Sequence, residues 1–127
     1  MRCNPYDPRV TENLTVLHVA CLCAAWCRLC DDYAPVLERT ISELELPGVK
    51  LRGHWIDIED EAELVGDVDV ETFPTIVVIG PEGVRFAGPV LPHADTLGRL
   101  LRNTAEPPTT NADPEYQAFA QRLRART

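Results

Sequence analysis

Apolar runs alternate with amphipathic stretches along most of the chain, and their order predicts an α/β domain. Residues 14–23 are almost wholly apolar and rich in β-branched side chains, which is typical of a strand buried on both faces. Residues 27–44 carry apolar side chains at helical spacing, and Pro35 within them is expected to kink the helix. Further along, the pattern predicts strands at 49–58, 75–79 and 84–87, a short helix at 60–68 and a helix at 94–102. The last two strands are separated by a turn, so they should form a hairpin, and the whole set should make a mixed sheet of about four strands flanked by helices.

The two ends of the chain differ in composition from this central part, residues 14–104. Residues 1–13 are polar and contain two prolines, so we expect an irregular arm, and residues 105–112 form a proline-containing linker. Residues 113–127 begin with a helix-start signature of Asp, Pro and Glu and should form an extra C-terminal helix. Its apolar stripe should pack back on the domain, or alternatively bind a partner or a second copy; the stripe consists of Tyr116, Phe119, Ala120 and Leu123.

Size and charge narrow the possible functions. The chain has 127 residues, which suits one domain, and a formal net charge of -8. Arginines cluster only at the C-terminal end, so we expect no nucleic-acid partner, because phosphate binding needs a positive face. The apolar run that begins at residue 14 is too short to span a bilayer and leads directly into Trp26 and Cys27, as a signal peptide would not. We therefore expect no membrane association, a cytoplasmic location, and a monomer or weak dimer.

The reactive candidate is the sequence Trp26-Cys27-Arg28-Leu29-Cys30, at the start of the first predicted helix. Two cysteines three positions apart can close a small disulfide ring. Helix N-terminal N–H groups and the helix dipole stabilise a thiolate on Cys27, which lowers its pKa below the free value of about 8.5. Cys27 is therefore the expected nucleophile and Cys30 the expected resolving cysteine of a thiol–disulfide exchange site.

This motif, in its context, resembles the thioredoxin family. Pro35 lies at the family distance after the first cysteine, Phe73-Pro74-Thr75 is similar to the segment that opens the third central strand, residues 68–72 match its usual lead-in, and Gly88 resembles a glycine near the substrate groove. The resemblance implies a thioredoxin-like fold of order β-α-β-α-β-β-α. It also implies a cis bond before Pro74, which would turn the Phe73 backbone toward the sulfur atoms and let a substrate strand pair there.

The chain also departs from the family pattern, as a divergent member would. The pair between the two cysteines is Arg28-Leu29, where thioredoxin has Gly-Pro. The buried aspartate beneath the second cysteine of thioredoxin falls here at Cys21, and the lysine that partners it falls near Gly53. Because a thiol is a poor substitute for a carboxylate, release of a mixed disulfide by Cys30 should be slow.

The leading hypothesis is therefore an oxidoreductase that exchanges disulfides with protein substrates and needs no cofactor and no metal. A reductase or a small thiol would reset its dithiol. Trp26 would shield the site and present a flat apolar surface, with core packing alone as the alternative. Arg28 would either lower the pKa of Cys27 or remain solvated and shape docking. The substrate-binding residues expected from the motif and the resemblance are Trp26, Arg28, Leu29, Phe73, Pro74 and Gly88.

The remaining cysteines leave other functions open. Cys21 and Cys23 share one strand face and would be small packing residues or auxiliary redox thiols, while Cys3 on the arm would be an incidental free thiol. Together, Cys21, Cys23, Cys27 and Cys30 make the pattern C-x-C-x3-C-x2-C, which zinc or a cuprous ion could occupy. We expect the strand pair not to converge with the helix-start pair, which argues against that metal site. A third possibility is a thioredoxin-like docking or chaperone protein with little turnover.

Overall fold

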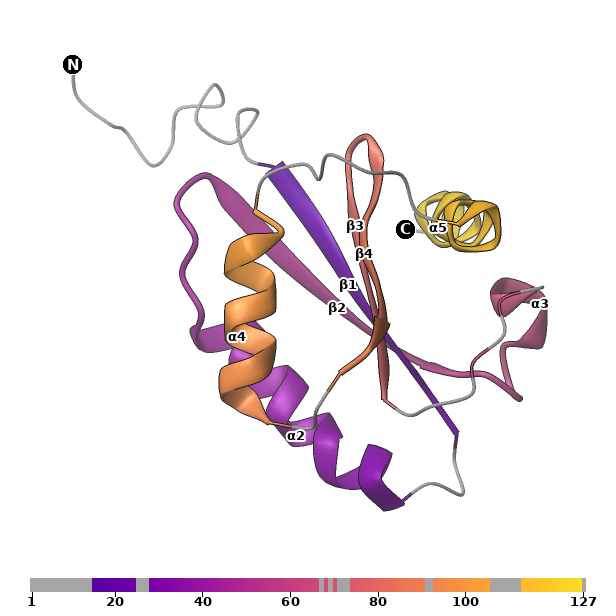
Figure 1. Ribbon diagram of the computed structural model, residues 1–127, viewed down its shortest axis with the longest axis horizontal. Helices are drawn as coiled ribbons and strands as arrows, with labels where there is room; N and C mark the ends of the chain where they lie inside the picture. The colour runs from indigo at the N-terminus through magenta and orange to yellow at the C-terminus, as the bar shows by residue number, and fades with distance from the viewer. Residues whose placement is uncertain are drawn as a thin grey trace.

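A four-stranded mixed sheet lies between two pairs of helices (Figure 1). This computed structural model describes residues 15–24, 28–66, 68, 70, 74–90, 93–105 and 113–126. The predicted arm at 1–13 and nearly all of the predicted linker at 105–112 lie outside the described residues. The elements are β1 (Thr15–Cys23), α2 (Arg28–Glu43), β2 (Val49–Asp57), α3 (Ala62–Val65), β3 (Thr75–Gly80), β4 (Gly83–Pro89), α4 (Ala94–Asn103) and α5 (Pro114–Arg126).

The strand order is β2-β1-β3-β4, which confirms the predicted mixed sheet. Strand β1 runs parallel to β2 and antiparallel to β3, and β3 forms the predicted hairpin with β4. Strands β1 and β3 are therefore interior strands, covered by helices on both faces. This position explains why both are apolar at nearly every residue instead of alternating apolar and polar side chains.

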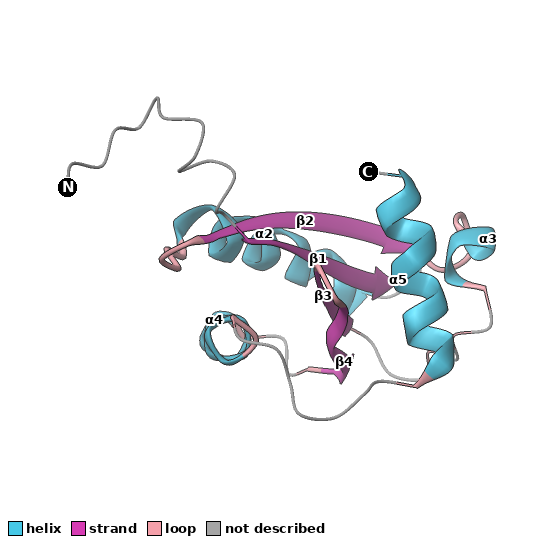
Figure 2. Ribbon diagram, turned by 90° about the horizontal axis from the view of Figure 1, so that it is seen from above, coloured by secondary structure: helices cyan, strands magenta, loops and turns pink. Residues whose placement is uncertain are grey.

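Each face of the sheet has its own core, and β1 contributes to both. Leu17, Val19 and Cys21 belong to the cluster under α2 and α4, whereas Ala20 and Leu22 belong to the cluster under α3 and α5. Helix α2 continues through Pro35. Figure 2, seen from above, again shows the pair α3 and α5 on one side of the sheet. Among the helices of the described residues, none has the length and hydropathy needed to cross a membrane.

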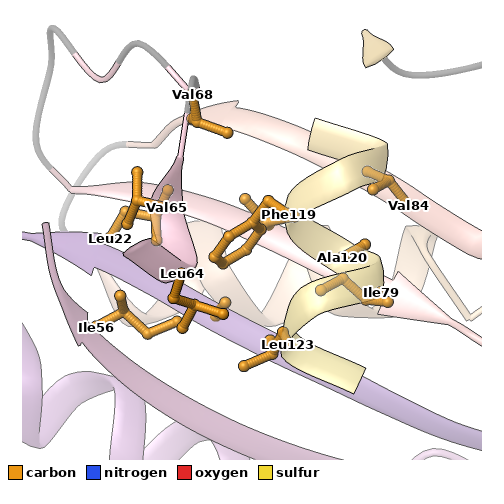
Figure 3. Packing of buried hydrophobic residues seen from close by; sticks show 12 residues of the cluster. Leu22, Ile56, Leu64, Val65, Val68, Ile79, Val84, Phe119, Ala120 and Leu123 are labelled. Carbon is orange, nitrogen blue, oxygen red and sulfur yellow. The ribbon is translucent and has the colours of Figure 1, made fainter. Parts of the chain in front are cut away.

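Helix α5 covers the second face with an apolar side that is buried except for Tyr116, which is partly buried. Phe119 is 0% exposed, and Ala120 and Leu123 are also buried. In Figure 3 these side chains point toward Leu64 and Val65 of α3 and toward the sheet. The stripe read from the sequence therefore packs within the same molecule.

Helix α3 is shorter than the predicted helix at 60–68, with only four residues. It ends at Gly66, whose φ of 63° lies in the left-handed region that favours glycine. The Arg122 side chain of α5 donates hydrogen bonds to two carbonyl groups at the end of α3. Its Nε donates to the Leu64 carbonyl at 2.7 Å and its Nη2 to the Val65 carbonyl at 2.9 Å. The short helix is thus held by a tertiary contact that no local pattern encodes.

Replacing Arg122 with methionine should lower the free energy of unfolding by about 1–3 kcal/mol, because two charge-assisted hydrogen bonds are lost while the aliphatic stem is kept. Arg126→Met is the matched control on the same helix. It removes an ion pair with Glu61 at 2.7 Å, but its side chain is 55% exposed, so the loss should stay below about 1 kcal/mol. Urea unfolding of the two variants measures the difference, and equal losses would contradict this account of Arg122.

Candidate redox site

A disulfide joins the end of β1 to the start of α2. Cys23 is the last residue of β1 and Cys30 lies in the first turn of α2, with their Cα atoms 5.9 Å apart. The connection is short because β1 runs into the N-terminal end of α2. Both cysteines are 1% exposed. Cys30 is therefore in a disulfide, but its partner is Cys23, whereas the sequence predicts Cys27.

The structure describes the predicted site residues only in part. Cys27, Trp26 and Phe73 lie outside the described residues, as does the side chain of Leu29. The Cys27–Cys30 pair therefore stays a prediction. Arg28 opens α2 with an exposed side chain.

Pro74 and Gly88 lie at the same end of the sheet as the disulfide. Thr75 pairs with Leu22, so the preceding Pro74 lies level with Cys23 on the neighbouring strand. Pro74 is fully buried. Gly88 lies on β4 opposite Ile76, which itself pairs with Cys21. Pro74 and Gly88 thus lie level with the cysteines of β1 in the strand register, Pro74 immediately before β3 and Gly88 on β4.

Cys21 lies directly beside the disulfide. Its Sγ is 3.5 Å from the Sγ of Cys23 on the same strand face. Because a disulfide sulfur carries no proton, the Cys21 thiol must be the donor in this contact. Burial raises the pKa of Cys21 to about 12, so the thiol stays protonated at neutral pH. Cys21 can therefore donate a hydrogen bond here, but it cannot act as the base that the aspartate of the family supplies.

Tyr33, one turn after Cys30, belongs to the same buried cluster. Its hydroxyl is buried and has no hydrogen-bond partner among the described residues. Burial raises the pKa of Tyr33, and the nearby Cys21 raises it further. An unpaired buried O–H costs free energy, and this one makes no hydrogen bond to the sulfur atoms of the cluster.

The sequence predicts that the strand cysteines do not converge with the helix-start pair, and for Cys30 this prediction is wrong. Cys21, Cys23 and Cys30 lie together, since the first turn of α2 lies against the face of β1 that carries Cys21 and Cys23. The disulfide leaves only Cys21 of these three as a free thiol. Within the described ranges, no group of three or more Cys, His, Asp or Glu side chains could hold a metal ion.

A second polar cluster occupies the opposite sheet face. His18 of β1 and His54 of β2 are joined by a hydrogen bond of 3.0 Å between Nδ1 and Nε2. Burial lowers the pKa of both side chains. The charges of Arg52 and Arg124 lower that of His18 further, as does its neighbour His54, and Arg52 and Arg126 act on His54 in the same way. This pair is a partly buried contact between β1 and β2, on the sheet face opposite to the sulfur cluster.

The histidine pair predicts a pH dependence of stability. Because both pKa values are lower in the folded state than the unfolded value of about 6.5, the unfolded chain binds more protons as the medium is acidified. The contribution to stability is thus complete above about pH 6.5 and decreases as the pH falls below it. Thermal unfolding between pH 7.5 and 5.5 should show this decrease, and the double variant His18→Gln, His54→Gln should flatten it. An unchanged slope in the double variant would contradict this interpretation.

Comparison with known proteins is consistent with this geometry. The sheet order, the flanking helices and the cysteine at the start of α2 define a thioredoxin-like fold. The thioredoxin family model matches residues 4–90, which is more than half of the chain. The protein therefore belongs to the thioredoxin family. A search of curated proteins finds no match.

Several solved structures share the fold. A thioredoxin mutant from Halobacterium salinarum is 27% identical with a TM-score of 0.55, over 77% of this chain and 81% of the other. The thioredoxin of Fasciola hepatica is 23% identical with a TM-score of 0.56, over 78% and 89%. The first thioredoxin domain of mouse protein disulfide-isomerase A4 is also 23% identical, with a TM-score of 0.60 over 86% and 79%.

Reasoning from sequence missed Cys23 as the partner of Cys30. The available signal was its place at the end of a strand, on the face that a following helix must cover. The sequence predicts correctly that Cys21 and Cys23 share one strand face, and an auxiliary redox thiol is one of the roles it allows for them. What was missing was the distance from that face to the first turn of the helix.

Proposed function

We propose that the protein is a thiol–disulfide oxidoreductase that acts on protein disulfides through a Cys27–Cys30 couple. The observation that carries the proposal is the oxidised state of Cys30, in the first turn of α2, within a member of the thioredoxin family. A sulfur at this place has the helix N-terminus beside it, where N–H groups and the dipole favour a thiolate. Cys27, three residues earlier in the sequence, is the proposed nucleophile for contact with substrate.

The proposed reaction is a pair of exchange steps. The Cys27 thiolate attacks one sulfur of a substrate disulfide, forming a mixed disulfide and releasing the first substrate thiolate. Cys30 then attacks Cys27, closing the Cys27–Cys30 disulfide and releasing the second substrate thiol. No cofactor takes part. A reductase or a small thiol would return the dithiol, so that in a reducing compartment such as the cytoplasm the net reaction is reduction of the substrate.

Docking or chaperone activity with little turnover is the second candidate. The observation that favours it is the bond between Cys30 and Cys23, which withholds Cys30 from a mixed disulfide on Cys27. In that case the region around Pro74 and Gly88 would bind substrates without exchange.

Turnover of a disulfide-bonded test protein distinguishes the two candidates. Insulin with dithiothreitol as the terminal reductant is a suitable assay, because reduced insulin precipitates. An oxidoreductase accelerates the precipitation at catalytic concentrations of this protein. Binding of insulin without acceleration would reject the exchange reaction in favour of docking.

A further inference from the structure

We propose that Cys23 is a third redox-active cysteine, which takes over the disulfide of Cys30 after each exchange and stores it in the core. This inference rests on the proposed function of the Cys27–Cys30 couple. It starts from the disulfide between Cys23 and Cys30, in which both residues are 1% exposed. One sulfur atom forms one disulfide, so Cys30 cannot be bonded to Cys23 and Cys27 at the same time.

The transfer is an internal exchange that needs no additional oxidant. The substrate disulfide first receives two electrons from the protein, which leaves the Cys27–Cys30 disulfide. The Cys23 thiolate then attacks the sulfur of Cys30: the Cys23–Cys30 bond forms, the Cys27–Cys30 bond breaks and Cys27 leaves as a thiolate. The proton lost by Cys23 balances the one that Cys27 can take up. Cys27 is then free again, while the oxidising equivalent lies inside the protein.

The surroundings of Cys23 suit the role of attacking and leaving group. The Cys21 thiol, with its pKa of about 12, donates toward the Cys23 sulfur from 3.5 Å and remains a donor when that sulfur becomes a thiolate. Hydrogen bonds to a charged acceptor are the strong ones, so the Cys21 thiol stabilises the charge that moves through Cys23. A disulfide with a merely structural role requires no such donor.

Burial makes Cys27 the route by which the stored disulfide returns to the surface. An external thiol cannot reach sulfur atoms on residues that are 1% exposed unless the structure opens. Attack of Cys27 on Cys30 reverses the transfer and exposes the Cys27–Cys30 disulfide to reductants. Reduction of the native protein should therefore depend on Cys27, although Cys27 is not part of the stored bond.

Disulfide mapping of the wild-type protein tests where the bond resides. The protein is oxidised with oxidised glutathione, quenched in acid and alkylated after denaturation. Digestion with trypsin and chymotrypsin cuts after Trp26 and Arg28, so peptides with Cys23, Cys27 and Cys30 separate. We expect the Cys23–Cys30 pair to be the larger share, with Cys27 alkylated. A larger share of Cys27–Cys30, or no disulfide within the chain, would overturn the inference.

Reduction kinetics test the route. Under native conditions, dithiothreitol should reduce the Cys23–Cys30 bond at least about tenfold more slowly in Cys27→Ser than in the wild type, since the entry thiol is missing. In denaturing urea both proteins should react at the same rate, which controls for intrinsic reactivity. Equal native rates would overturn the proposed transfer.

The inference and the proposed function fail in different ways. Insulin turnover through Cys27 and Cys30, with Cys23 a thiol throughout, keeps the function and rejects Cys23 as a redox cysteine. If the Cys23–Cys30 bond is present but the protein does not turn over insulin, the proposed exchange reaction is rejected. The proposed transfer of the disulfide to Cys23 is then rejected with it.

Discussion

Replacing Cys27 with serine is expected to reduce turnover of a disulfide-bonded substrate to the uncatalysed rate, a loss of about 100-fold or more. Only a thiolate attacks a disulfide sulfur at neutral pH, and a serine hydroxyl does not ionise in this range. Removal of the nucleophile of a covalent mechanism leaves only substrate binding. The measurement is the initial rate of insulin reduction with wild-type and variant protein at equal concentration.

Cys3→Ser is the matched control for this experiment. It removes another cysteine of the same chain, one that the proposed mechanism does not use. Its turnover should equal that of the wild type. Near wild-type turnover in Cys27→Ser, or a large loss in Cys3→Ser, would show that the nucleophile lies outside the Cys27–Cys30 motif.

Replacing Phe119 with alanine is expected to lower the free energy of unfolding by about 3–5 kcal/mol. The ring is 0% exposed and lies in the cluster formed by α3, α5 and the second sheet face, so its removal leaves a cavity that the surrounding side chains fill only in part (Figure 3). Because a domain of this size is stable by about 5–15 kcal/mol, the variant should be close to its limit of stability. Urea unfolding monitored by circular dichroism gives the value.

Gln121→Ala controls for changes to the helix itself. Gln121 is exposed on the same helix, and the substitution should change stability by no more than about 0.5 kcal/mol. A loss below about 1 kcal/mol in Phe119→Ala would show that α5 is not part of the cooperative core, and it would favour the alternative in which the helix serves a partner.

Much of the fold could be predicted because burial on both faces leaves a clear signal. The continuous apolar runs of β1 and β3 identify interior strands, and the turn between β3 and β4 identifies a hairpin. The helix stripe with Phe119 and Leu123 shows that α5 buries one side. That stripe does not say against which surface the helix packs, because a helical period gives the width of a buried face and nothing about its partner.

The length of α3 and the disulfide partner of Cys30 are two features that local sequence patterns do not predict. Helix α3 ends at Gly66 and is held by Arg122, which lies far along the chain, so its length depends on a tertiary contact. For the cysteines, the spacing in the sequence favours a disulfide between Cys27 and Cys30. The pairing of Cys30 with Cys23 depends on where the first turn of α2 lies relative to the end of β1, which spacing alone does not encode.

Trapping of a substrate on Cys27 tests the central claim most directly. The variant Cys3→Ser, Cys30→Ser keeps the proposed nucleophile but removes the resolving cysteine and the cysteine of the arm. After incubation with oxidised insulin, mass spectrometry of the digested protein should find the substrate joined to Cys27 in a mixed disulfide that persists, because the resolving cysteine is missing. A variant that carries no adduct, or carries it on Cys21 or Cys23 with Cys27 unmodified, would contradict Cys27 as the nucleophile.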